Sequence, residues 1–166
     1  MTLILKHNAL IALFALILPF ASALAQQSSV EGLWRSEDGE GIVEVAPCAQ
    51  GATPRCGKIV WIKKPLDDKG RPIVDAKNPN AALKTRPICG IEILSGLKPN
   101  ATGGFDGGTI YDPEEGKTYT GAMVLAGDKL KVTGSIEMPV VGPLSDSENW
   151  TRVTTAFERC TGAPKK

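Results

Sequence analysis

The sequence predicts an all-β protein, specifically an eight-stranded antiparallel up-and-down barrel. Eight short segments rich in β-forming residues recur along the chain, and Gly, Pro, Asn and Asp lie between them. Most of these separations are short enough for hairpins, and no segment predicts a helix longer than two turns. An eight-stranded barrel leaves no exposed sheet edge, and its interior is either packed or holds one small ligand. A β-sandwich is the alternative.

The expected strands follow from local patterns of apolar residues and turns. The residues of 129–137 alternate most clearly, with Leu130, Val132, Gly134 and Ile136 on one face. The residues 138–147 contain Pro and Ser and are expected to form a loop. In chain order, the expected strands are 31–36, 41–46, 57–63, 88–97, 108–111, 117–126, 129–137 and 148–154.

One long connection interrupts the strands. Eight Pro, Gly and Asp residues within 64–87 exclude a long regular element there. Asn78 and Pro79 predict one helical turn over 80–84, with Asn78 as its N-cap. A connection of this length is usually functional or disordered, and here it is expected to cover the mouth of the barrel.

Residues 1–25 have the order of a cleavable signal peptide. Lys6 precedes a long apolar run, and Ala23-Leu24-Ala25 forms a small-residue cleavage site. A transmembrane anchor is the alternative, but Pro19 and the Ala-rich end favour cleavage. We therefore expect one barrel domain over 26–166, exported to the periplasm or secreted, with no integral membrane segment in the mature chain.

All four cysteines lie within this mature region. An even number in an exported chain predicts disulfides, and three pairings are possible. Cys48 and Cys56 flank a loop between two expected strands, so Cys48–Cys56 with Cys89–Cys160 is the preferred pairing. A zinc site is the alternative, which the spacing disfavours because no Cys-x-x-Cys is present.

Charge and composition exclude several classes of function. Without Lys6 the mature chain has 18 basic and 18 acidic residues. This balance gives no excess of positive charge that would indicate nucleic-acid binding. His7 is the only histidine and lies in the expected signal peptide, so no His-dependent triad is expected. No motif indicates a catalytic site, a metal site or a cofactor, and the oligomeric state stays open.

Two resemblances support the barrel. Gly32-Leu33-Trp34 together with Arg152 near the last strand resembles the calycin group, which includes lipocalins and avidins. The resemblance implies that Trp34 lies at the barrel floor with Arg152 packed across it, so both are structural residues.

A second resemblance covers almost the whole mature chain. Ordered motifs resemble the bacterial domain-of-unknown-function family 2147, which comprises small exported proteins. No activity comes with this resemblance, so it implies only the fold and the compartment. The motifs include Gly57-Lys58-Ile59-Val60-Trp61, Asp75-Ala76-Lys77-Asn78-Pro79-Asn80, Gly107-Gly108-Thr109-Ile110-Tyr111-Asp112-Pro113 and Trp150-Thr151-Arg152.

The favoured function is binding of a small apolar or amphipathic molecule. Trp61, Tyr111 and Tyr119 are candidates for a cavity lining, since ligand pockets combine aromatic rings with a few polar groups. Packing within the core is the alternative for these rings. Asp75, Asn78 and Arg86 are the polar candidates from the 64–87 connection.

Two other functions stay open. One is an envelope interaction or structural module with a packed barrel and no ligand. The other is a hydrolase without histidine that uses two carboxylates, with Asp75, Glu92 and Asp112 available.

Overall fold

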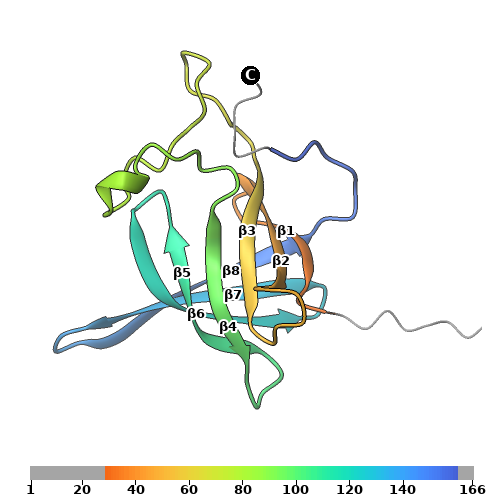
Figure 1. Ribbon diagram of the computed structural model, residues 1–166. Helices are drawn as coiled ribbons and strands as arrows, with labels where there is room; N and C mark the ends of the chain where they lie inside the picture. The colour runs from red at the N-terminus through yellow and green to blue at the C-terminus, as the bar shows by residue number, and fades with distance from the viewer. Residues whose placement is uncertain (1–28, 161–166) are drawn as a thin grey trace, which may run out of the picture.

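The computed structural model describes residues 29–160, which form a closed barrel of eight antiparallel strands (Figure 1). Each strand pairs with the next in sequence, and β1 also pairs with β8 to close the barrel. This confirms the up-and-down barrel and excludes the sandwich. The expected signal peptide, 1–25, lies outside the described residues. The elements are β1 (Gly32–Arg35), β2 (Gly41–Pro47), β3 (Arg55–Ile62), the 3-10 helix η1 (Ala81–Leu83), β4 (Glu92–Pro99), β5 (Phe105–Asp112), β6 (Lys117–Ala126), β7 (Lys129–Met138) and β8 (Gly142–Arg152).

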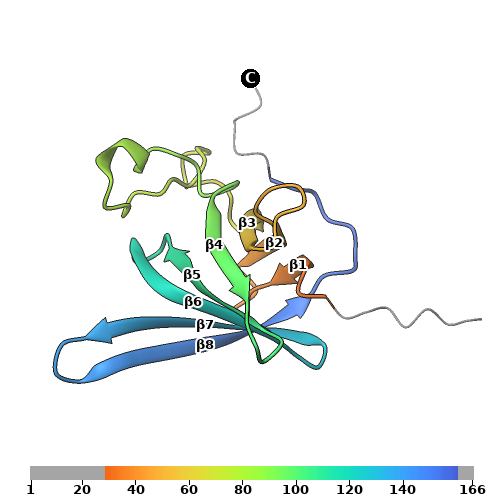
Figure 2. The ribbon, with the colours of Figure 1, turned by 60° about the horizontal axis from the view of Figure 1, so that its bottom comes forward.

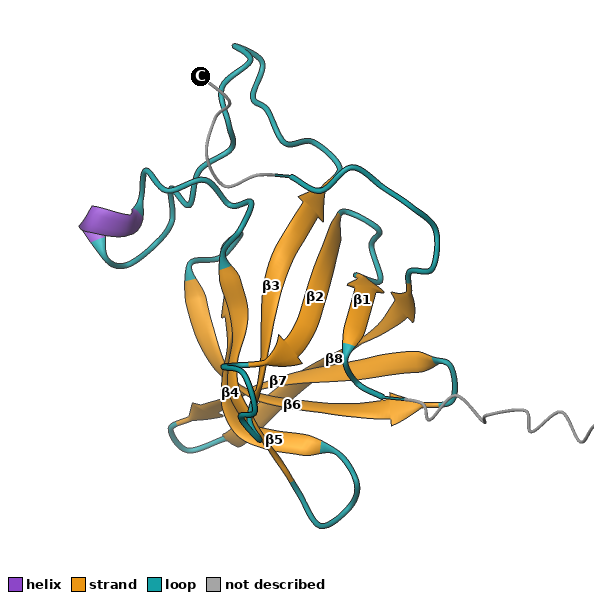
Figure 3. Ribbon diagram, turned by 45° about the vertical axis from the view of Figure 1, so that its right-hand side comes forward, coloured by secondary structure: helices purple, strands orange, loops and turns teal. Residues whose placement is uncertain are grey.

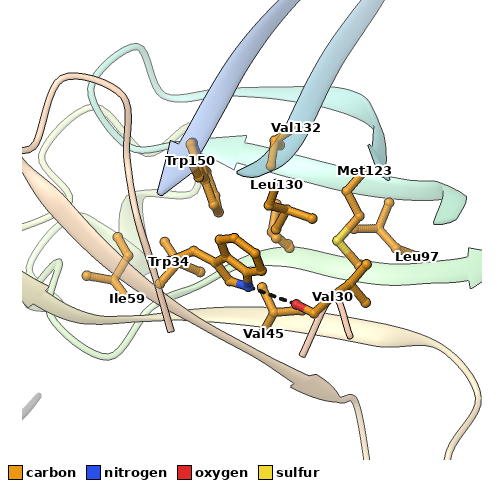
Figure 4. Close-up of a cluster of buried hydrophobic side chains, with 11 residues drawn as sticks. Val30, Trp34, Val45, Ile59, Leu97, Met123, Leu130, Val132 and Trp150 are labelled. Carbon is orange, nitrogen blue, oxygen red and sulfur yellow. Dashed lines mark hydrogen bonds between the residues drawn. The ribbon is translucent and has the colours of Figure 1, made fainter. Parts of the chain in front are cut away.

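The two ends of the barrel differ. Side chains fill the interior toward the β2–β3, β4–β5 and β6–β7 turns, which we call the closed end (Figure 4). Trp34, Leu97 and Leu130 are fully buried there, because alternate residues of each strand point inward. The opposite, open end carries the β1–β2 and β5–β6 turns and the long connection between β3 and β4 (Figure 3).

Trp34 joins the two terminal strands. Its indole Nε1 donates to the carbonyl of Val30 at 2.8 Å, and the guanidinium carbon of Arg152 lies 4.0 Å from the ring centroid. Arg152 also donates to the carbonyl of Glu31 at 3.0 Å. Gly32 has a φ of 129°, and a Cβ there would lie 2.6 Å from Arg152 Nη1. The glycine of the Gly-x-Trp motif is therefore required by both its backbone conformation and the space that Arg152 occupies.

The hairpin of β7 and β8 extends beyond the barrel wall (Figure 2). Its pairing is unbroken from Lys129↔Thr151 to Met138↔Gly142, so the expected loop over 138–147 is wrong for Met138 and for 142–147. Cross-strand hydroxyl pairs help to explain this, since Ser135 and Ser145 lie 2.8 Å apart at their Oγ atoms. The serines that indicated a loop are paired strand residues.

The 64–87 connection is held in place by short backbone pairings rather than by a regular element. Isolated bridges join Leu66 to Pro72 and Val74 to Pro87. The expected helical turn exists as η1, but its N-cap is Asn80, whose side chain accepts from the Ala82 amide at 3.0 Å. The assignment of the cap to Asn78 is wrong, because its Oδ1 accepts from the Asn80 amide at 2.9 Å, just before η1, and its Nδ2 donates to Asp75.

Both preferred disulfides are present. Cys48–Cys56 spans the β2–β3 turn. Cys89–Cys160 attaches the segment after β8 to the end of the β3–β4 connection, just before β4. The Cys160 amide also donates to the carbonyl of Val60 at 2.8 Å. The C-terminal segment therefore returns to the outer side of the barrel at β3. Among the described residues, no helix is long and apolar enough to cross a membrane.

Removing either disulfide should destabilise the protein by about 2–4 kcal/mol. The loss for Cys89→Ala/Cys160→Ala should exceed that for Cys48→Ala/Cys56→Ala, because the sequence separations are 71 and 8 residues. Thermal melts of both double variants measure the effect. Thiol titration should detect no free thiol in the native protein, and finding two would contradict the pairing.

Candidate functional site

A cavity of about 620 Å³ occupies the open end of the barrel. Its volume lies within the range of small-molecule sites. Strand residues form most of the lining, and Lys64, Ile73 and Ile88 from the β3–β4 connection contribute to it. The apolar lining includes Val43, Ile59, Ile93, Ile110, Val132 and Trp150.

The mouth of this cavity is acidic. Seven carboxylates and one lysine, Lys64, are among its lining residues. The acidic residues come from three elements: Asp38 and Glu40 after β1, Asp112, Glu114 and Glu115 around the β5–β6 turn, and Asp146 and Glu148 on β8.

Asp75 is the centre of a polar network between the 64–87 connection and β5. Its carboxylate is fully buried. Oδ1 accepts from Tyr111 Oη at 2.5 Å, and Oδ2 accepts from Asn78 Nδ2 at 2.7 Å. Arg86 donates to Oδ2 through Nε at 3.0 Å and lies within 2.9 Å through Nη2. The network therefore links three residues of the connection to β5.

The hydrogen bonds decide the charge of this network. Burial by itself raises the pKa of Asp75, but donation from Tyr111, Asn78 and Arg86 outweighs burial and leaves the pKa below its usual value. The pKa of Tyr111 is raised by burial and by its hydrogen bond to Asp75. Asp75 is therefore an anion and Tyr111 a neutral donor at neutral pH.

A second contact fixes the connection at the β5–β6 turn. Gly116 has a φ of 71°, and a Cβ there would lie 2.0 Å from the carbonyl oxygen of Lys77. Only glycine permits this close approach. Together with the Asp75 network, the contact holds the connection against the barrel rim.

Of the six candidate binding residues, only Tyr111 and Tyr119 line the cavity. Tyr119 Oη donates to Glu115 at 2.7 Å, and that hydrogen bond, followed by burial, raises the pKa of Tyr119 to about 12. Asp75, Asn78 and Arg86 are brought together, but none of them lines the cavity, and the Asp75 oxygens already have protein partners.

The placement of Trp61 in the cavity wall is wrong. Ile42 pairs with Trp61 and Val43 with Ile59, so Val60 is an extra residue in a bulge. The bulge reverses the alternation after Ile59 and turns Trp61 to the outer face. There the guanidinium carbon of Arg35 lies 4.8 Å from its ring centroid.

Sequence reasoning missed the contribution of β8. Trp150, Glu148 and Asp146 all line the cavity, and Glu148 accepts from Trp150 Nε1 at 2.7 Å. Their spacing of two residues was the available signal. The loop expected over 138–147 hides Asp146, whereas Glu148 and Trp150 lie in the expected strand 148–154 and were not named as candidates for the cavity lining.

The carboxylates named for a hydrolase do not share a cleft. Asp112 lines the cavity, whereas Asp75 does not. Asp112 Oδ1 accepts from the amides of Glu114 and Glu115 at 2.7 and 3.1 Å, as a turn-forming aspartate does. Among residues 29–160, no group of three or more His, Cys, Asp or Glu side chains is arranged to hold a metal ion.

Comparison with solved structures identifies a similar fold. Protein HP1028 from the human pathogen Helicobacter pylori, described as belonging to the lipocalin family, matches with a TM-score of 0.62. The two chains are 21% identical, and the match covers 76% of this chain and 84% of the other. This similarity shows the fold. No curated protein matches the sequence significantly.

A family model matches residues 32–152, which include every strand of the barrel. The family is described as uncharacterized proteins conserved in bacteria, DUF2147. The match begins at Gly32 in β1 and ends at Arg152 in β8. It therefore spans the chain between the two strands that pair to close the barrel. The chain belongs to the DUF2147 family.

Proposed function

We propose that this protein is an exported binding protein that holds a small apolar or amphipathic molecule inside its barrel. The cavity of about 620 Å³ is the observation that carries this proposal. Its deep wall is apolar, its mouth is polar, and the 64–87 connection forms part of its lining. This is the arrangement of a small-molecule site. Two disulfides support export, because disulfides persist in oxidising compartments.

Filling the cavity should abolish binding. Gly134 lines the cavity, and a Cβ there would meet Tyr119 at an ordinary contact distance of 3.5 Å. Gly134→Leu should therefore fit the strand, project into the cavity and lower affinity for the neutral fluorescent probe N-phenyl-1-naphthylamine by about tenfold or more. A fluorescence titration measures this.

Ser135→Leu is the matched control. Ser135 is the next residue of β7 and faces the other side, where its hydroxyl contacts Ser145. It should leave probe affinity unchanged. Failure of the wild-type protein to bind the probe, combined with native mass spectra without any retained small molecule, would refute the proposal.

An interaction module is the second candidate function, and the tip of the β7–β8 hairpin favours it. Val140 is fully exposed, and Val141, Met138 and Leu144 are also exposed. Exposed apolar side chains that lie together often mark contact surfaces. Sedimentation of the wild type and of Val140→Ser/Val141→Ser tests the simplest partner, a second copy of the chain. A concentration-dependent dimer that the variant loses would support this function.

A further inference from the structure

We propose that the ligand of the cavity is a cationic amphiphile, an apolar body with a protonated amine or guanidinium group, and that its cation lies beside Glu148. This inference rests on the proposed function and specifies the chemical class of the ligand. Three observations carry it: the imbalance of charge at the mouth, the position of Glu148, and the aromatic rings that line the same cavity.

Among residues 29–160, lysines pair with only two of the seven acidic residues of the cavity lining. Glu40 pairs with Lys63 at 2.7 Å and Glu115 with Lys117 at 3.1 Å. Within residues 29–160, no ion pair reaches the other five acidic residues of the lining: Asp38, Asp112, Glu114, Asp146 and Glu148. A bound anion would enter a strongly negative mouth, whereas a bound cation would be attracted to it.

Glu148 lies on the inner face of β8, nearer the closed end than Asp146, and is exposed to solvent. The β7–β8 register sets it opposite Val132, with Trp150 on the closed-end side and Asp146 on the mouth side. Trp150 Nε1 donates to Oε2, while no hydrogen bond to Oε1 is present among the described residues. One oxygen is therefore fixed against the indole, and the other is available to the cavity.

Aromatic rings complete a site suited to a cation. Trp150, Tyr111 and Tyr119 all line the cavity. The face of an aromatic ring attracts ammonium and guanidinium groups, and the attraction grows when the cation is desolvated. The Glu148 carboxylate, which accepts from the Trp150 indole, can bind the charged end of an amphiphile. The hydrocarbon body of the amphiphile can then enter the barrel along its apolar wall.

Three ten-carbon ligands that differ only at the head group test the inference. Decylamine, decanol and decanoate are titrated below their micellar concentrations against the protein loaded with N-phenyl-1-naphthylamine. We expect decylamine to displace the probe at about tenfold lower concentration than decanol, and decanoate to be the weakest. The advantage of decylamine over decanol should shrink in 0.5 M salt, because salt screens the ion pair.

The variant Glu148→Gln tests whether the preference for decylamine over decanol depends on the Glu148 carboxylate. The amide oxygen still accepts from Trp150 Nε1, so the fold is retained while the charge is lost. The variant should lower decylamine affinity about fivefold or more and leave decanol unchanged. Glu137→Gln is the control, because Glu137 lies on the opposite face of the same hairpin and pairs with Pro143.

The outcomes separate the two proposals. Equal affinity for the three ligands, or preference for decanoate, would overturn the cationic class while leaving the binding function intact. A decylamine preference that survives Glu148→Gln would overturn the role of Glu148. Absence of binding by the probe and by all three ligands would refute the proposed function itself.

Discussion

Trp34→Ala is expected to lower the free energy of unfolding by about 3–5 kcal/mol, which is typical of a buried tryptophan replaced by alanine. Trp34 is completely buried in the packed closed end of the barrel, so its removal leaves a large void. The change also leaves the Val30 carbonyl without its indole donor and Arg152 without the ring beneath it. Equilibrium denaturation in urea, followed by circular dichroism, measures the loss.

Trp61→Ala is the matched control. Trp61 carries the same side chain and also lies under an arginine, Arg35, but it is partly exposed on the outer face of β3. Its loss should cost about 1 kcal/mol, the strength of a cation–π contact with partial exposure. Equal losses in the two variants would show that Trp34 has no special part in closing the barrel.

Asp75→Ala should also destabilise the protein by about 3–5 kcal/mol. Removing one partner of a buried charged network leaves the others without acceptors, and here Tyr111, Asn78 and Arg86 all lose theirs. The 64–87 connection should then become sensitive to limited proteolysis before the barrel unfolds, because this network links the connection to β5. Urea denaturation and timed digestion measure the two effects.

The pH dependence gives a second measure of the same network. The pKa of Asp75 is lowered in the folded protein, so its ionised form contributes stability that is fully present above its unfolded value of about 4. That contribution should be lost as the pH falls through the folded pKa. The difference in stability between wild type and Asp75→Ala should therefore be constant at neutral pH and shrink below about pH 4.

Asp67→Ala is the control for Asp75→Ala. Asp67 also belongs to the 64–87 connection and pairs with an arginine, Arg71, but this pair is exposed. Its removal should have a much smaller effect on stability and none on proteolysis near Asn78. A loss as large as that for Asp75→Ala would contradict the importance of the buried network.

Local patterns were sufficient to predict the barrel. The alternation in 129–137 and the Gly- and Asp-containing turns specify where strands start and stop, because both act over a few residues. The same reasoning failed in 142–147, where serines and a proline indicated a loop. Those residues form a strand because β7 provides partners for their backbone and hydroxyl groups.

The candidate site was only partly predictable. Tyr111 and Tyr119 line the cavity as expected, but the bulge at Val60 turns Trp61 to the outside. Asp75, Asn78 and Arg86 were named as candidate ligand contacts, and nothing in their spacing indicates that they bind one another through a buried carboxylate. That arrangement depends on Tyr111, which is 36 residues away from Asp75 in sequence.

The sequence by itself determined the eight-stranded barrel, the preferred disulfide pairing and the two residues, Trp34 and Arg152, that meet at its closure. Each of these follows from periodicity, turn chemistry, cysteine spacing or a family resemblance. Only the tertiary structure decided that the open end contains a cavity and that its mouth combines carboxylates from three separate elements. The physical reason is that a cavity and its electrostatic field are set by residues distant in sequence, which closure of the barrel brings together.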